Sequence, residues 1–246
     1  EYIKINQLKH NGVAGKVYAT GAVNLKDKLG WDLDASLVRF KPQYFVSSVK
    51  GEVSGHVKTQ GVWSEQLKRI DIRQLNAAGF INNKPIRGRG NLTLLLDSSQ
   101  KGFLPQQFEA NDLYFSYAQN QLQATGNAQS LKIKLNAPAL YELYPGLKGR
   151  AYGSLNVQSQ PRLKAIANIA VDNFAFKDVA SVRSLRIQGE LPTSETTPTL
   201  LAAKIDHLRS GNREIENATV NLAGTRKAHV LKVESKNRQS NLYVQL

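Results

Sequence analysis

Cysteine and methionine are both absent from the 246 residues of the chain. Without cysteine, the protein can form no disulfide, no thiolate metal site and no cysteine nucleophile. No stretch of the sequence approaches the roughly 18 consecutive apolar residues that a membrane helix needs. Because methionine is missing and Glu1 already leads into an alternating run, we expect a segment of a longer protein, with any signal or anchor outside it.

Patterns that carry catalysis or bind metals are missing too. The four histidines, His10, His56, His207 and His229, are scattered and have no partner at a metal-ligand spacing. His207 follows Asp206, but neighbouring residues of a strand point to opposite faces, so the two side chains are not expected to meet. No nucleophile-elbow, zinc-protease or phosphate-loop motif occurs. We therefore predict no catalytic residue, no metal and no cofactor, and a protein that is not an enzyme.

Positive charge is in excess, with 33 Lys and Arg against 19 Asp and Glu, for a formal net charge of +14. These basic residues are spread along most of the chain, as Lys16, Lys58, Arg89, Lys134 and Arg186 illustrate, and few aromatic residues alternate with them. A nucleic-acid site would gather them into one patch. The pattern favours a solvated basic surface and no nucleic-acid partner, while attraction for anionic lipid headgroups stays open.

Alternation of apolar and polar residues with a period of two dominates the sequence. It is clear in residues 17–25, 92–96, 131–135 and 185–191. Such alternation is typical of strands with one apolar face and one wet face. Turn-like breaks at Asp27-Lys28, Asn82-Asn83, Asn111-Asp112, Asn173 and Asn237-Arg238 separate the runs. The sequence therefore predicts an all-β, mostly antiparallel fold.

Two segments depart from this alternation. Residues 137–147 place Leu140, Leu143, Tyr144 and Leu147 at helical spacing between prolines, which predicts one short amphipathic helix. Residues 64–75 fit a helix or a strand, and the sequence does not decide between them. No linker divides the chain, so we expect a single continuous β segment over residues 1–246.

About 14 such strands cannot leave an apolar face open to water. The face must be covered by a second sheet, closed on itself or folded into a trough, and there is almost no helical material to cover it. Small residues recur at apolar positions, as in the run from Val49 through Gly51, Val53 and Gly55 to Val57. These glycines either leave space inside the fold or allow strands to approach closely.

Three stretches of the chain carry motifs of Gly, Pro and Leu at fixed spacing. Residues 138–149 read P-x-L-x-x-L-x-P-x-L-x-G, and Gly153, Leu155 and Pro161 follow. Residues 222–233 are similar to the pattern L-x-G-T-x-x-x-H-x-L-x-L, and residues 15–21 are similar to a repeated Gly–Tyr–Gly strand pair. In this order along one chain, the motifs resemble those of the TamB family of the AsmA-like superfamily, with Gln158 or Ser159 where a glycine is common in the family. Their order makes the resemblance specific.

The resemblance implies a long sheet rolled into a U-shaped trough, a β-taco, with an apolar interior that holds phospholipid acyl chains. It also implies a periplasmic location, an inner-membrane anchor on the full-length protein, and an outer-membrane partner of the Omp85 class, both reached through parts outside this segment. The alternative function is a chaperone for outer-membrane protein assembly that binds clients by β-augmentation. The expected lipid-binding residues are apolar members of the alternating runs: Val17, Val23, Trp31, Leu33, Leu37, Val49, Val53, Val57, Leu92, Leu94, Leu96, Leu113, Phe115, Ile133, Leu135, Leu155, Val157, Ile169, Val171, Leu185, Ile187, Val220 and Leu222.

Overall fold

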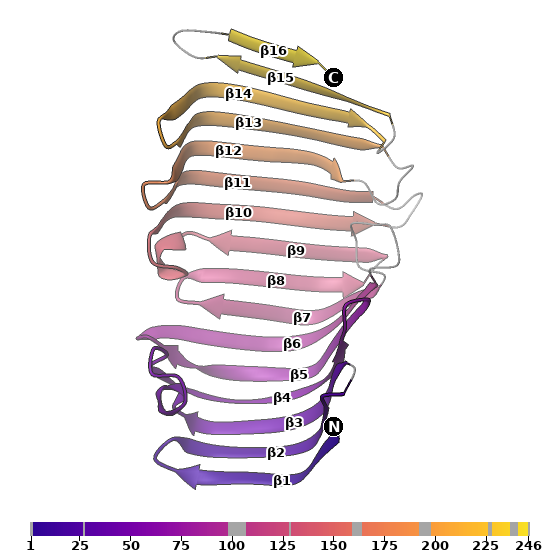
Figure 1. Ribbon diagram of the computed structural model, residues 1–246, viewed down its shortest axis with the longest axis vertical. Helices are drawn as coiled ribbons and strands as arrows, with labels where there is room; N and C mark the ends of the chain where they lie inside the picture. The colour runs from indigo at the N-terminus through magenta and orange to yellow at the C-terminus, as the bar shows by residue number, and fades with distance from the viewer. Residues whose placement is uncertain are drawn as a thin grey trace. The chain divides into compact units, whose positions relative to one another are not determined.

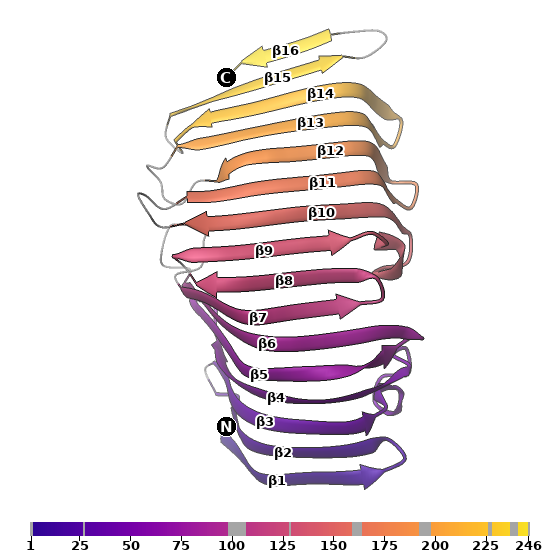
Figure 2. The ribbon, with the colours of Figure 1, turned by 180° about the vertical axis from the view of Figure 1, so that it is seen from behind.

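The computed structural model describes residues 2–26, 28–97, 107–127, 129–158, 164–191, 198–225, 228–236 and 241–245. These residues divide into two compact units (Figures 1 and 2). The first unit contains the strands β1 (Tyr2–Gly12), β2 (Gly15–Asn24), β3 (Leu29–Phe40), β4 (Gly51–Trp63), β5 (Leu67–Ile81), β6 (Lys84–Asp97), β7 (Gln107–Tyr117) and most of β8 (Asn120–Asn127). The second unit contains β9 (Ser130–Ala137), β10 (Leu147–Gln158), β11 (Lys164–Phe176), β12 (Ala180–Leu191), β13 (Thr199–Ser210), β14 (Arg213–Gly224), β15 (His229–Lys236) and β16 (Asn241–Gln245).

Every strand ladder in both units is antiparallel and joins strands that follow one another in the chain. Among the described residues, no ladder closes the sheet of either unit on itself. The prediction of an open, all-β, antiparallel fold is therefore confirmed. The prediction of one continuous segment over residues 1–246 stays a prediction.

The hairpin turns follow local turn chemistry only in part. Asn82 and Asn83 have φ angles of 48° and 62°, which suits the tight turn between β5 and β6, as predicted. The breaks predicted at Asn111-Asp112 and at Asn173 are wrong, because β7 and β11 continue through them. The break at Asp27 and the one at residues 237–238 lie outside the described residues.

What looked like turns at Asp112 and Asn173 are bulges inside strands. Asp112 has a φ of 47° beside Gly90 at 106°, and Asn173 has a φ of 49° beside Gly149 at 100°. A Cβ atom on Gly90 would lie 2.5 Å from the Asp112 carbonyl oxygen, and one on Gly149 would lie 2.6 Å from that of Asn173. Such bulges bend the strands that carry them, and the strands of each unit curve as a trough requires (Figures 1 and 2).

The helix predicted over residues 137–147 is shorter than expected. It is the single 3-10 turn η2 (Leu140–Glu142), because β9 extends to Ala137 and β10 already begins at Leu147. The buried Asn120 side chain holds the loop, since its Nδ2 donates to the Ala139 carbonyl at 3.0 Å and its Oδ1 accepts from the Ala139 amide at 3.2 Å. A second 3-10 turn, η1 (Pro42–Tyr44), lies between β3 and β4.

Candidate functional site

Apolar side chains share one face of the second unit in straight rungs across the strands. Ladder partners join Leu135, Gly153, Ile169, Ile187, Ala203 and Val220 in one rung. The next rung joins Ile133, Leu155, Ala167, Gly189, Leu201 and Leu222. All the residues predicted in this part of the chain lie on that face: Ile133, Leu135, Leu155, Val157, Ile169, Val171, Leu185, Ile187, Val220 and Leu222.

The first unit has a similar face, although bulges shift its rungs. Ladder partners place most of the predicted residues on it, namely Val17, Val23, Trp31, Leu33, Leu37, Val53, Val57, Leu92, Leu94, Leu96 and Phe115. Leu113 follows the bulged Asp112, two positions before Phe115. Val49 was expected on a strand and is not, because β4 begins only at Gly51; Val49 lies in the preceding loop, where its amide donates to the Val46 carbonyl at 2.9 Å.

Sequence reasoning missed the contribution of β5 to this face, because residues 64–75 were left undecided. Ile70 joins the rung of Trp31, Gly61 and Leu94, and Ile72 joins that of Leu33 and Leu92. The alternation of Ile70 and Ile72 about Asp71 was the available signal. A bulge between Ile72 and Leu75 breaks the period directly afterwards, which hid it.

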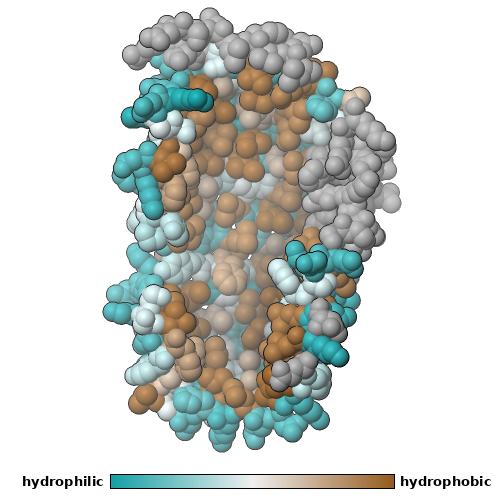
Figure 3. Space-filling view, viewed as in Figure 1, coloured by the Kyte–Doolittle hydropathy of each residue, from teal (hydrophilic) through white to brown (hydrophobic). Residues whose placement is uncertain are grey.

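The apolar face carries no covering layer in the described part of either unit. No large described side chain is fully buried; the buried apolar residues are mostly alanines such as Ala110 and Ala165, both at 0% exposure. Phe115 and Ile169 remain 46% and 40% exposed although they lie on that face. In Figure 3, hydrophobic residues gather on the face turned to the viewer in each unit, with hydrophilic residues at the margins.

The glycines on this face do two different things. In the first unit they are places of close approach: a Cβ on Gly55 would lie 2.5 Å from the Asn76 carbonyl oxygen, and one on Gly61 would lie 2.3 Å from the Trp31 ring. The Trp31 indole thus fills the position over Gly61, and its Nε1 donates to Thr59 Oγ1 at 3.1 Å. Of the two interpretations of these glycines, close approach holds here.

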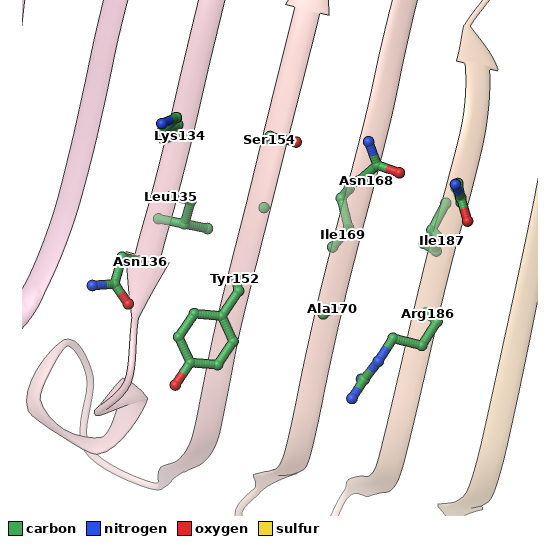
Figure 4. Close-up of a pocket in the computed structure, with 12 residues that line it drawn as sticks. Lys134, Leu135, Asn136, Tyr152, Ser154, Asn168, Ile169, Ala170, Arg186 and Ile187 are labelled. Atoms are coloured by element: carbon green, nitrogen blue, oxygen red, sulfur yellow. The ribbon is translucent and has the colours of Figure 1, made fainter.

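Gly153, in the second unit, is not a place of close approach. A Cβ there would lie 3.5 Å from the Asn168 carbonyl oxygen and 3.9 Å from both Leu135 Cβ and Ile169 Cγ1, which is ordinary van der Waals contact. An open hollow of about 470 Å³ lies at this position and spans β9 to β12 (Figure 4). Its lining includes Leu135, Gly153, Ile169 and Ile187 together with polar residues at adjacent positions, such as Tyr152 and Asn168.

The opposite face of the sheet carries charged side chains that pair with one another. Asp34 lies 3.7 Å from Lys58 Nζ in the first unit, and Asp172 pairs with both Arg150 and Arg186 in the second. These pairs keep that face hydrated and raise the contrast with the apolar face.

Asp71 is a buried acid on this polar face, with 4% of its surface exposed. Its Oδ2 accepts from Arg69 Nε at 2.9 Å and from Gln60 Nε2 at 3.0 Å. Burial alone would raise the pKa of Asp71, but the hydrogen bonds from Gln60, Arg69 and Thr93 and the charge of Arg69 outweigh it and lower the pKa below the ordinary 3.8.

One expectation about the histidines is wrong. Asp206 Oδ1 and His207 Nδ1 lie 2.7 Å apart, although they are adjacent in β13. His207 has a φ of 47°, which breaks the alternation and turns its ring toward the same side as Asp206. Within the described residues, no cluster of three or more His, Asp or Glu side chains could hold a metal ion. Nor does that part of the chain contain a helix long and apolar enough to cross a membrane.

These features define a class of protein: an open antiparallel sheet with an uncovered apolar face and an ion-paired opposite face. The family model for the N-terminal domain of TamB matches residues 1–246, so the chain belongs to the TamB family. It is also 25% identical over 243 residues to the "Translocation and assembly module subunit TamB" of Haemophilus influenzae (strain ATCC 51907 / DSM 11121 / KW20 / Rd). That match covers 95% of this chain and 18% of the relative, so the chain spans less than a fifth of the relative's length. No solved structure matches the chain.

Proposed function

We propose that the apolar face of each unit shields phospholipid acyl chains during lipid transfer between the inner and outer membranes. The observation that carries this proposal is the absence of a covering layer over the apolar rungs in the described residues. A contiguous exposed apolar face marks a site that binds another molecule. Acyl chains would fit such a site and contribute about 0.8 kcal/mol for each buried methylene.

The energetics suit passage along the sheet better than tight capture. A phospholipid loses nearly the same burial energy when it leaves a bilayer as it gains on an apolar protein face. The net free energy of transfer from the bilayer to the protein face is therefore close to zero. Open aliphatic rungs, such as those through Ile169 and Ile187, provide contact without a deep pocket that would trap the lipid.

The proposal includes a setting for the protein. We place this segment in the periplasm, as part of a longer protein anchored in the inner membrane. An outer-membrane partner of the Omp85 class would bind parts outside this segment. The segment itself would act through binding, without catalysis, cofactor or nucleic acid.

The name of the Haemophilus relative contains the words "translocation and assembly". This favours a second candidate function, which we take to be the assembly of outer-membrane proteins. In that function, client strands would add to a free sheet edge through backbone hydrogen bonds. Lipid transfer would depend on the side chains of the apolar face, whereas client assembly would depend on backbone groups at the sheet edge. A charge on the apolar face, as in Leu94→Asp, should cripple lipid transfer and leave edge binding largely intact.

Photocrosslinking in cells tests the proposal on a matched pair of isoleucines. Ile169 and Ile166 both belong to β11, are 40% and 38% exposed, and lie on opposite faces of the sheet. With a benzophenone side chain at either position, we expect phospholipid adducts at Ile169 and none at Ile166. Leu94 and Leu95 provide the same comparison in the first unit, since they are adjacent in β6. Protein adducts at all four positions, or no lipid at any, would contradict the proposal and favour the assembly function.

A further inference from the structure

One margin of the apolar face in the first unit carries a positive charge. Ladder pairing joins Leu29 to Trp63, Trp63 to Lys68, and Lys68 to Leu96 in the outermost rung of β3, β4, β5 and β6. The next rung inward consists of Trp31, Gly61, Ile70 and Leu94, and the one after it of Leu33, Thr59, Ile72 and Leu92. Across these three rungs, Lys68 carries the only charge.

Lys68 is placed over an exposed aromatic ring. Its Nζ lies 5.2 Å from the centroid of the Trp63 ring, within the range of a cation–π contact. Trp63 is 48% exposed, and Leu29 and Leu96 beside it are also exposed. This rung therefore combines apolar surface, an indole ring and an ammonium group at the point where the apolar face meets water.

An open hollow of about 540 Å³ lies at the same margin. Its apolar lining comes from Leu25, Leu29 and Trp63, and its polar lining comes from Lys28, Ser64, Glu65 and Lys68. The lining thus contains two lysines, Lys28 and Lys68, and one carboxylate, that of Glu65. Glu65 takes part in an interaction of its own. The hollow has a net positive charge and suits an anionic group.

We propose that this hollow binds the phosphate of a phospholipid headgroup, with Lys68 as the principal cation. This inference rests on the proposed function and adds the position and orientation of the lipid in the first unit. Lysine recognises phosphate as a point charge, and tryptophan favours the boundary between apolar and aqueous surroundings. Successive rungs of one face are about 6.7 Å apart, so the acyl chains would begin on the rung of Ile70 and Leu94.

The arrangement of the rungs favours a lipid over a soluble anion. A soluble anion would use the lysines alone and would gain nothing from Leu29, Trp63 and Leu96. The exposed apolar neighbours and the continuous descent into the apolar rungs favour a ligand with a phosphate at one end and chains at the other. We therefore commit to phospholipid as the occupant.

The experiment measures lipid crosslinking in the purified chain with benzophenone at Leu94 or at Ile169. Vesicles of phosphatidylethanolamine and phosphatidylglycerol supply the lipid. We expect Lys68→Glu to lower phospholipid adducts at Leu94 by about tenfold, since it replaces attraction with repulsion at the phosphate. Lys68→Arg keeps the charge and should retain most of the adducts. Lys16→Glu makes the same change of net charge on the opposite face of β2 and should leave the signal unchanged.

The Ile169 position separates failure of this inference from failure of the proposed function. If the unaltered chain gives no lipid adduct at either Ile169 or Leu94, the proposed function fails. If both positions give adducts and Lys68→Glu leaves Leu94 unchanged, only the headgroup site is wrong. Diacylglycerol, which lacks phosphate, is the last control. Its adducts at Leu94 should not change in Lys68→Glu. If diacylglycerol and phospholipid adducts fall by the same factor, Lys68 does not recognise the phosphate.

Discussion

Gly61 in the first unit and Gly153 in the second occupy comparable places on an apolar face, yet their surroundings differ. The Trp31 ring covers Gly61, and a Cβ there would also lie 2.6 Å from the Arg69 carbonyl oxygen. Gly153 has no such neighbour, and a Cβ would meet only Leu135, Ile169 and the Asn168 carbonyl at 3.5 Å or more. A glycine thus accommodates a neighbouring aromatic ring in the first unit, whereas in the second unit it lines an open hollow.

The ladders of the two units differ in a related way. In the first unit, register shifts interrupt β1–β2 and each ladder from β3 to β7. In the described ladders of the second unit, only β10–β11 is shifted. Frequent bulges bend the strands of the first unit, whereas the second unit keeps long, straight aliphatic rungs. Under the proposed function, an acyl chain would meet a bulged surface in the first unit and a straighter surface in the second.

The largest effect should come from adding a side chain at Gly61, which the Trp31 ring covers. Gly61→Val would force the Trp31 ring and the β5 backbone apart, and we expect it to lower the free energy of unfolding by about 3 kcal/mol. Gly153→Val should change it by less than about 0.5 kcal/mol, because the space is already open. Urea unfolding of both variants measures the difference. Equal costs at the two glycines would contradict the comparison.

The next largest effect is expected at Asn173, in a bulge of the second unit that resembles the one at Asp112 in the first. Asn173 has a φ of 49°, which a β-branched residue tolerates poorly. Asn173→Val should therefore cost about 2 kcal/mol of unfolding free energy, measured by urea denaturation. Asn173→Gly removes the strain without changing the backbone and should be neutral or slightly stabilising. Were Val to be tolerated as well as Gly, the bulge would not be needed for the bend.

These bulges also explain how far the sequence alone could go. Straight ladders preserve the period of two, so every residue predicted in the second unit lies on the expected face. A bulge adds one residue and reverses the period, which is why Asn111-Asp112 and Asn173 resembled turns and why β5 was left undecided. Whether Gly61 or Gly153 is covered depends on the side chain opposite it on the neighbouring strand, and alternation within one strand carries no such information.

Asp71 is next to Ile70, the ladder partner of Gly61 in the first unit. It should make the free energy of unfolding depend on pH. Its pKa is lowered by folding, so its contribution is present above about pH 4 and is lost as the pH falls through the folded-state value. Asp71→Asn should cost about 1–2 kcal/mol of unfolding free energy at pH 7 and less at pH 3. Asp34→Asn, which removes an exposed pair with Lys58, should cost under about 0.5 kcal/mol at either pH. A pH-independent cost at Asp71 would show that its charge contributes nothing.

The smallest effect tests whether the open hollow of the second unit is used by lipid. Gly153→Leu would fill the gap between Leu135 and Ile169 with protein and displace about one acyl methylene, worth about 0.8 kcal/mol or a fourfold change in occupancy. Phospholipid adducts at a benzophenone on Ile169 should fall by that factor in vesicle suspensions. Ser154→Leu adds the same side chain on the opposite face and should leave the adducts unchanged. If Gly153→Leu binds lipid as well as the unaltered chain, then the hollow is a consequence of strand geometry alone, and the smooth rungs on either side of it carry the acyl chains.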